Sequence, residues 1–314
     1  MVDGGNVSTA AWCEPTITNC TATQIRSQFL HARWYVQNVV ATGNTLDLQL
    51  LESTEGGVIY LANTQNGTGD RNLVDSNTIS RTAYGRFWPS DGIPVYAETD
   101  TSNTTWSRNR IDQCKVAYNN NDGDGNKFIY NYVTNADILA QIHDIGDATI
   151  VGCDIQNNTM ICGAHQSFGA IPFGNESLIR LRNIDMAQSG TVDVRNNIFV
   201  GTGHADQYGL HLDANFLPTI VETNNCFYNV TTPVADKSEV SQATGTGTIT
   251  TDPGLVTSDY QLSSSSSNAA NAGTAIAGVT DDRDFHGNYP VDDAGAEDMG
   301  CAHQIDNGPP TEYT

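Results

Sequence analysis

The chain has 314 residues, a net charge of −22 and 38% apolar residues. That length allows a large core, and no apolar run approaches the roughly 18 to 20 residues of a spanning helix, so we expect no membrane insertion. Only three of its 14 basic residues are lysines. Nucleic-acid binding depends on clustered lysine and arginine, so we expect no nucleic-acid partner.

The composition indicates a mostly β protein. Thirty asparagines and 29 glycines accompany many threonines and serines, which favour turns and polar strand faces over helices. The acidity fits an exported protein that binds divalent cations, with solubility alone as the alternative. The opening "MVDGGNVSTAAW" has no leader pattern. We therefore expect a removed leader or another export route, such as assembly into a virus particle.

Seven cysteines form no CxxC pair and no Cys/His zinc pattern. Two pairs are close enough in sequence to form disulfides in an oxidising compartment: Cys13 with Cys20, and Cys153 with Cys162. Buried free thiols are the alternative.

A short phrase of alternating apolar and polar residues around asparagine recurs along the chain. Copies begin at residues 73 ("LVDSNTIS"), 106 ("WSRNRIDQC"), 128 ("FIYNYVTN"), 151 ("VGCDIQNNTM"), 193 ("DVRNNIFVG") and 221 ("VETNNCFYN"). Aligning three copies on Asn109, Asn131 and Cys153 gives spacings of 22 residues. In each copy an apolar residue, Ile111, Val133 or Ile155, follows two positions later. A fixed period of this size indicates a solenoid.

Each copy is too short to be stable alone, so we expect the copies to stack as parallel strands around one core. The asparagines then lie above one another at a turn and hydrogen-bond from rung to rung. The sequence therefore predicts an all-β fold, a single-stranded right-handed parallel β-helix over residues 1–256. Segments 82–104, 163–176 and 201–216 are expected to be inserted loops on a binding face.

Residues 257–314 are expected to form a loop-rich C-terminal cap. An acidic, Gly- and Pro-containing turn there precedes the phrase Asp293, Ala294, Gly295 and Ala296. This segment resembles the Asp-x-Gly-Ala closing motif of secreted bacterial surface proteins in the pectate-lyase-like parallel β-helix superfamily. Asp298 stands where that motif usually has glutamate, and Glu297 where it has an aromatic residue. The resemblance implies the fold but no single activity, because the superfamily includes lyases, hydrolases, adhesins and viral spikes.

The 22-residue register predicts an exposed file of Arg110, Tyr132 and Asp154. A tyrosine ring stacks on a sugar and an arginine pairs with a uronate, so Tyr132 and Asp154 are candidate substrate-binding residues and Arg110 a candidate catalytic base. The alternative is a solvated face with an ion pair between rungs.

The same register places His143 one coil before His165, with Asn121 one coil earlier. Histidine titrates near neutrality, so the two are candidate catalytic acid–base residues. A structural stack of imidazoles at a turn is the alternative.

The loop "NNDGDGNK" puts Asn120, Asp122 and Asp124 at alternate positions before Gly125. Oxygen ligands alternating around a tight glycine turn favour Ca²⁺, so these three residues are a candidate calcium site. The twelfth position is Asn131 instead of glutamate, and a turn without metal is the alternative.

Two hypotheses follow for the function. The first is an extracellular carbohydrate-active protein that binds an acidic polysaccharide and cleaves it by Ca²⁺-assisted β-elimination, with glycoside hydrolysis as the less favoured reaction. The second is a non-catalytic structural or adhesive protein that self-associates, such as a surface adhesin, filament subunit or viral spike. Both place the protein outside the cell, at the cell surface or on a virion.

Overall fold

The computed structural model describes most of the repeat region and short parts of the C-terminal segment. The described residues are 2–3, 14–23, 28–47, 57–64, 72–80, 93–98, 101–121, 123–144, 152–163, 176–183, 191–203, 205, 207–212, 219–236, 241–255, 262, 268–270, 272–274 and 299–300. All the strand pairs that join its strands into sheets are parallel, and none of the described residues is helical. Consequently, none of the described segments is a helix that could cross a membrane.

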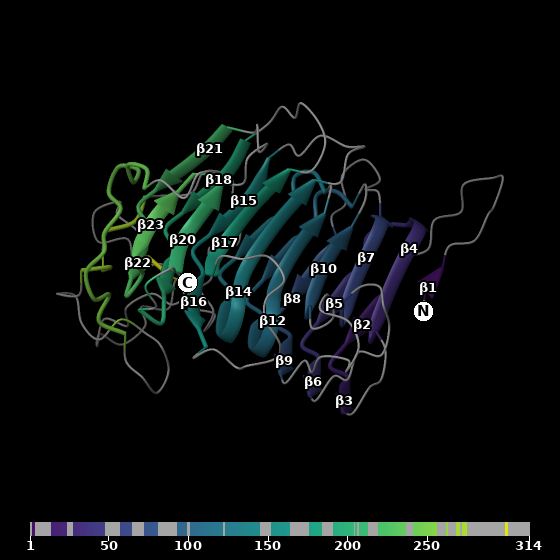
Figure 1. Ribbon diagram of the computed structural model, residues 1–314. Coiled ribbons are helices and arrows are strands. Elements are labelled where there is room, and N and C mark those ends of the chain that lie inside the picture. Colours follow the sequence, from purple (N-terminus) through teal and green to yellow (C-terminus); the bar gives the residue numbers. More distant parts are fainter. Residues whose placement is uncertain are drawn as a thin grey trace, which may run out of the picture.

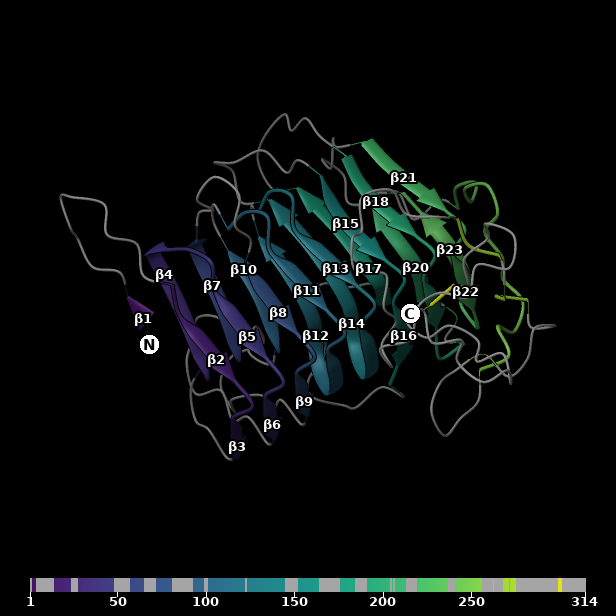
Figure 2. The ribbon, with the colours of Figure 1, turned by 180° about the vertical axis from the view of Figure 1, so that it is seen from behind.

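The strands stack in chain order and form three faces (Figure 1). The first face contains β2 (Thr16–Thr18), β5 (Val40–Thr42), β8 (Leu73–Asp75), β11 (Thr105–Ser107), β13 (Lys127–Ile129), β15 (Cys153–Gln156), β18 (Thr191–Arg195) and β21 (Thr219–Thr223). Figure 2 gives the opposite view of this stack.

The other two faces belong to one branched sheet. Two long strands, β12 (Arg110–Asn121) and β14 (Tyr132–Asp144), run through both faces and bend at Gln113 and Asn135, whose φ angles are 57° and 53°. Their first segments lie on the second face with β3 (Thr21–Thr23), β6 (Thr45–Asp47), β9 (Thr78–Ser80), β16 (Thr159–Cys162), β19 (Ile198–Val200) and β22 (Cys226–Tyr228). Their second segments lie on the third face with β1 (Val2–Asp3), β4 (Leu30–Val36), β7 (Ile59–Thr64), β10 (Val95–Glu98), β17 (Glu176–Asn183), β20 (Gln207–Leu212) and β23 (Thr232–Ala235).

This arrangement confirms the predicted fold class, a parallel β-helix. Alternate side chains point inward, as strand geometry requires, and form one core along the axis. Ile111 and Val133 are neighbours in it, in the predicted register, and both are fully buried.

A ladder of buried asparagines joins the coils at the turn from the first face to the second. Its members are Asn44, Asn77, Asn109, Asn131, Asn158, Asn197 and Asn225. Each side-chain oxygen after Asn44 accepts hydrogen bonds from both the backbone N–H and the side-chain amide of the preceding member, as Asn131 does from Asn109 at 2.9 and 3.0 Å. The predicted shared turn of Asn109 and Asn131 is therefore confirmed.

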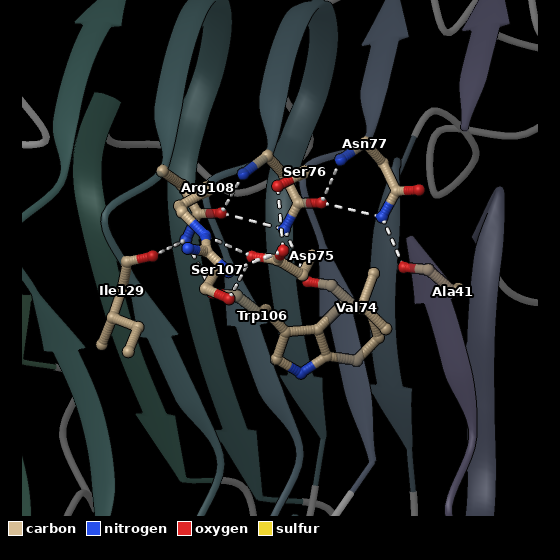
Figure 3. Close-up of polar contacts among 11 residues, drawn as sticks. Ala41, Val74, Asp75, Ser76, Asn77, Trp106, Ser107, Arg108 and Ile129 are labelled. Carbon is tan, nitrogen blue, oxygen red and sulfur yellow. Dashed lines mark hydrogen bonds and ion pairs between the residues drawn. The ribbon is translucent and has the colours of Figure 1, made fainter. Parts of the chain in front are cut away.

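The residue before each ladder position has a left-handed backbone. Asparagine fills this position at residues 157, 196 and 224, which explains the repeated asparagine pairs. Arg108 adopts φ 50° there, although this conformation is unfavourable for a long side chain. Its guanidinium holds Asp75 on the previous coil, with Nε donating to Oδ1 at 2.7 Å and Nη2 to Oδ2 at 2.8 Å (Figure 3). This bidentate pair stabilises the turn across the rungs.

The third predicted copy is out of register. Asn158, not Cys153, follows Asn131 in the ladder, 27 residues later. Ile155 therefore lies on the first face beside Phe128, not beside Val133. This coil is five residues longer than the expected 22, and the extra residues lie between β14 and β15.

Described parts of the C-terminal segment pack against the last coils. Leu262, Ala269 and Met299 form an apolar cluster with Ile198 and Cys226. Further hydrogen bonds join Ala272, Thr274 and Gly300 to the turn asparagines at 196 and 224.

Candidate functional site

A file of polar and aromatic side chains lies along the outer side of the third face. Its members, one per strand from β4 to β20, are His31, Tyr60, Tyr96, Asn119, Gln141, Arg180 and His211. Neighbouring strands lie about 4.8 Å apart, so six steps span about 29 Å. The residues on either side in these strands, such as Leu30 and Ala32, are mostly members of the core, so the file faces away from it.

A second file runs parallel to the first, two residues further along each strand. It includes Arg33, Glu98, Asn121 and His143, with Glu98, Asn121 and His143 on consecutive strands. We call the two files together the polar strip.

Ring contacts and hydrogen bonds hold the polar strip in place. His31 meets Tyr60 edge to face at 4.6 Å between ring centroids, and the Tyr60 and Tyr96 rings are 5.3 Å apart. Gln141 donates to Asn119 at 3.1 Å. Contacts of this kind fix side-chain orientation before any ligand binds.

Exposure divides the polar strip into two groups. His31, Arg33, Tyr96, Glu98, Gln141 and His143 are half-buried and reach the surface. Tyr60, Asn119, Asn121, Arg180 and His211 are buried although they face away from the core. The first group leaves part of each side chain open to solvent, although both ring nitrogens of His31 and Nε2 of His143 are themselves buried.

Asn121 has an unused hydrogen-bonding atom. Its side chain is 4% exposed, and its Nδ2 donates to the Tyr96 hydroxyl at 3.3 Å. Its Oδ1 is buried and has no hydrogen-bond partner among the described residues. Turning the amide over would leave Nδ2 in that position instead. A buried polar atom of this kind is costly unless a ligand or water satisfies it.

The polar strip does not share the strongly acidic character of the whole chain. Its described side chains include two arginines, the half-buried Arg33 and the buried Arg180, and one carboxylate, that of Glu98. The chain as a whole carries −22. The described side chains of the strip therefore carry no net negative charge that would repel an anionic ligand.

Arg110 and Tyr132 lie on the second face, and the bends at Gln113 and Asn135 separate them from the polar strip. They are neighbours as predicted, and the Arg110 guanidinium carbon is 5.9 Å from the Tyr132 ring centroid. Arg110 is exposed, whereas Tyr132 is 2% exposed instead of pointing into solvent. The ring therefore offers little surface for a sugar.

Asp154 does not extend that file, and its predicted register was wrong. Thr159 lies beside Tyr132, whereas Asp154 lies on the first face between Lys127 and Asp193. Lys127 Nζ is 3.8 Å from an Asp154 carboxylate oxygen, and Arg195 pairs with Asp193. Burial raises the pKa of Asp154 to about 6, while Lys127 lowers it. The Lys127–Asp154 pair joins two strands and the Arg195–Asp193 pair lies within β18, so Asp154 takes part in an ion pair between rungs, the alternative considered for the outer face.

His143 has Asn121 as its register neighbour on β12, as expected. On its other side lies Arg182 of β17. The predicted partner His165 lies outside the described residues.

In the loop predicted to bind calcium, residues 120–124, the Asn120 side chain is buried. Its Oδ1 accepts from Asn126 at 3.0 Å, and its Nδ2 donates to the Gly123 carbonyl oxygen at 3.0 Å. Asp124 is half-buried, and Asp122 lies outside the described residues. No group of three His, Cys, Asp or Glu side chains in the described parts is arranged to hold a metal ion. The calcium site stays a prediction, with Asn120 already engaged in the turn.

The predicted disulfides do not form. Cys20 and Cys153 are free thiols, so neither predicted pair is joined. Cys153 is buried, as the alternative of buried free thiols expects, whereas Cys20 is exposed. Burial raises the pKa of Cys153 to about 12, and a thiol of that kind is chemically inert.

Sequence reasoning missed most of the polar strip because its strands have no asparagine marker and irregular spacing. The available signal was the alternation in "LHARWYV", "IYLANT" and "VYAE" at residues 30, 59 and 95, where polar or aromatic residues alternate with core residues. No protein-family model matches the chain, and no curated protein matches it either.

Proposed function

We propose that the polar strip binds an acidic polysaccharide outside the cell. The observation that carries this proposal is the concentration of arginine, histidine, tyrosine and amide side chains in stacked register on one face of a chain with net charge −22. A linear polymer laid along the axis meets a new polar side chain at each strand. Tyrosine rings stack on sugars, and guanidinium groups pair with uronate carboxylates.

The unused atom of Asn121 supports a sugar as the ligand. A buried amide oxygen requires a donor, and sugar hydroxyls are donors that lie beside the carboxylate of a uronic acid. A nucleic acid fits less well, because binding to a phosphate backbone depends on clustered lysine and arginine, and the described side chains of the polar strip include two arginines and no lysine.

Two arginine variants test the location of the site. Arg33 is half-buried on the polar strip, and Arg110 is exposed on the second face. Removing an arginine that pairs with a uronate weakens binding by roughly tenfold or more. We therefore expect Arg33→Ala to lose about tenfold in affinity for a polyuronate, measured by calorimetry, and Arg110→Ala to bind like the parent protein.

Thermal unfolding of both variants provides the control for folding. Loss of binding in Arg110→Ala alone would move the site to the second face. Failure of the parent protein to bind any polyuronate would refute the proposed function.

A further inference from the structure

We propose that the first coil of the β-helix is an interface at which two copies of the chain join end to end as a symmetric dimer. This coil consists of β2, β3 and the corner between them, which holds Cys20. The inference does not depend on the proposed function. It selects a closed dimer over the open filament that the hypothesis of a self-associating protein also allows.

Among the described residues, the first coil has neighbouring strands on one side only. β2 pairs with β5 and β3 pairs with β6, and neither has a second partner strand. The Pro15 carbonyl oxygen accepts from the Val40 N–H at 2.9 Å, and the Asn19 N–H donates to the next coil at 3.0 Å. Because the backbone groups of successive residues point to opposite edges of a strand, those of Thr16 and Thr18 face the open side. Such an edge is a template for a further strand.

The apolar core is open to solvent at the same end. The central residues of β2 and β3, Ile17 and Ala22, pack on the core but are only half-buried. Their register neighbours on the next coil, Ala41 and Leu46, are fully buried. The terminal repeat of a solenoid must be polar or covered for the chain to stay in solution. A partner on this end would bury Ile17 and Ala22 as the later coils bury their own core residues.

Cys20 occupies the ladder position of the first coil. It follows the left-handed Asn19, whose φ is 53°, and its N–H donates to Asn44 Oδ1 at 3.0 Å, as each ladder asparagine donates to the next. Every ladder asparagine also donates its side-chain amide to a carbonyl oxygen on the preceding coil. Cys20 has no amide, and its Sγ donates to the Thr18 carbonyl oxygen on the open edge at 3.5 Å. The exposed thiol therefore lies on the open side of the coil, where the ladder ends.

The character of this edge favours a second copy as the occupant. Residues 15–23 contain no charged side chain, whereas the whole chain carries −22. Two copies therefore meet with little repulsion when their first coils face each other. β2 and β3 are also alike, since each has three residues in the pattern Thr-x-Thr. A strand of one copy can thus match a strand of the other in length and in side chains.

The two ends of the stack differ, and this favours a head-to-head contact. Beyond the last coil, Ile249 forms a parallel bridge to Cys226, and Leu262 forms an antiparallel bridge to Leu255. Head-to-tail stacking would have to join the first coil to this dissimilar end. A head-to-head contact uses the same surface on both copies, so the assembly stops at two.

A two-fold axis beside Cys20 satisfies both open edges at once. It places β2 of one copy antiparallel to β3 of the other, and β3 of the first against β2 of the second. Each contact then joins two Thr-x-Thr strands, and main-chain hydrogen bonds supply the affinity, as in recognition by strand addition. The same axis brings the two Cys20 side chains close together.

The test measures the mass of the full chain by sedimentation equilibrium in reducing buffer, over a dilution series. We expect a reversible equilibrium between monomer and dimer. Thr18→Pro removes one N–H from the open edge, a change that an edge strand tolerates, and should weaken the dimer by about tenfold or more. Thr18→Val is the matched control, because it keeps the N–H and the side-chain shape, and it should dimerise like the parent chain. Thermal unfolding checks that both variants are folded.

A short bismaleimide cross-linker tests the position of the axis without any change to the edge. It should join two parent chains through Cys20, whereas Cys20→Ser should form the dimer and stay uncross-linked. A monomer at every concentration would overturn the inference, and so would assemblies that keep growing with concentration, which would indicate a filament. A dimer that is unchanged in folded Thr18→Pro, or one that is cross-linked equally in Cys20→Ser, would refute the first coil as the interface.

Discussion

Replacing Asn131 with alanine removes one complete rung connection from the asparagine ladder. The side chain makes five hydrogen bonds: its oxygen accepts two from Asn109, and its amide donates to the carbonyl oxygens of Trp106 and Ile129 and to Asn158 Oδ1. Asn131 is fully buried, so water cannot replace these bonds without entering the turn. At about 1 kcal/mol net for each bond, the loss is about 5 kcal/mol.

That loss is large compared with the roughly 5 to 15 kcal/mol by which a domain is stable. Urea unfolding of Asn131→Ala should therefore show a much lower midpoint, or no folded protein at all. The control is Asn268→Ala, which removes an exposed asparagine with one hydrogen bond to Asp252 and should cost less than about 0.5 kcal/mol. A loss below about 1 kcal/mol in Asn131→Ala would refute the reasoning, because the ladder would then contribute no more than ordinary surface contacts.

Two other measurements follow from the site residues. Because the pKa of Asp154 is raised to about 6 from 3.8, the folded protein binds this proton more tightly than the unfolded chain, and stability should fall as pH rises from about 4 through 6. Asp154→Asn should reduce this pH dependence of the unfolding free energy, measured by urea unfolding. An unchanged pH dependence in the variant would contradict the raised pKa of Asp154. Calcium binding at residues 120–124 should appear in calorimetry and be lost in the Asp122→Ala, Asp124→Ala double variant. The Asn120→Ala variant, whose oxygen is engaged with Asn126, should lose stability and keep any such binding.

The ladder was readable from the sequence because one residue type marks each coil. Asn109 and Asn131 share a spacing of 22 residues, and the core neighbours Ile111 and Val133 keep that spacing. The register failed at Cys153 because coil length is not fixed by the ladder. The correct marker was the asparagine pair at 157 and 158, where the first residue takes the left-handed turn and the second joins the ladder.

The candidate site was less predictable, since it depends on which residues of different coils become neighbours. His31 and Tyr60 are 29 residues apart, and Tyr60 and Tyr96 are 36 apart, yet each pair is adjacent in register. Unequal loops hide such contacts from any search for a period. Two neighbouring pairs of the polar strip, Asn121 with His143 and Asn119 with Gln141, lie within the regular part of the repeat. The sequence analysis identified the first of these pairs.

The unequal coil lengths have a consequence for how such a protein diversifies. Successive ladder asparagines are separated by as few as 22 residues and as many as 39. Lengthening a flexible loop in the ratio of 39 to 22 residues costs only about 0.5 kcal/mol of closure entropy. Losing the hydrogen bonds of one buried ladder asparagine costs several kcal/mol. Loops between the strands can therefore change in length at little cost while the asparagine ladder is kept. A laboratory graft of a foreign peptide between β14 and β15 should be tolerated for the same reason.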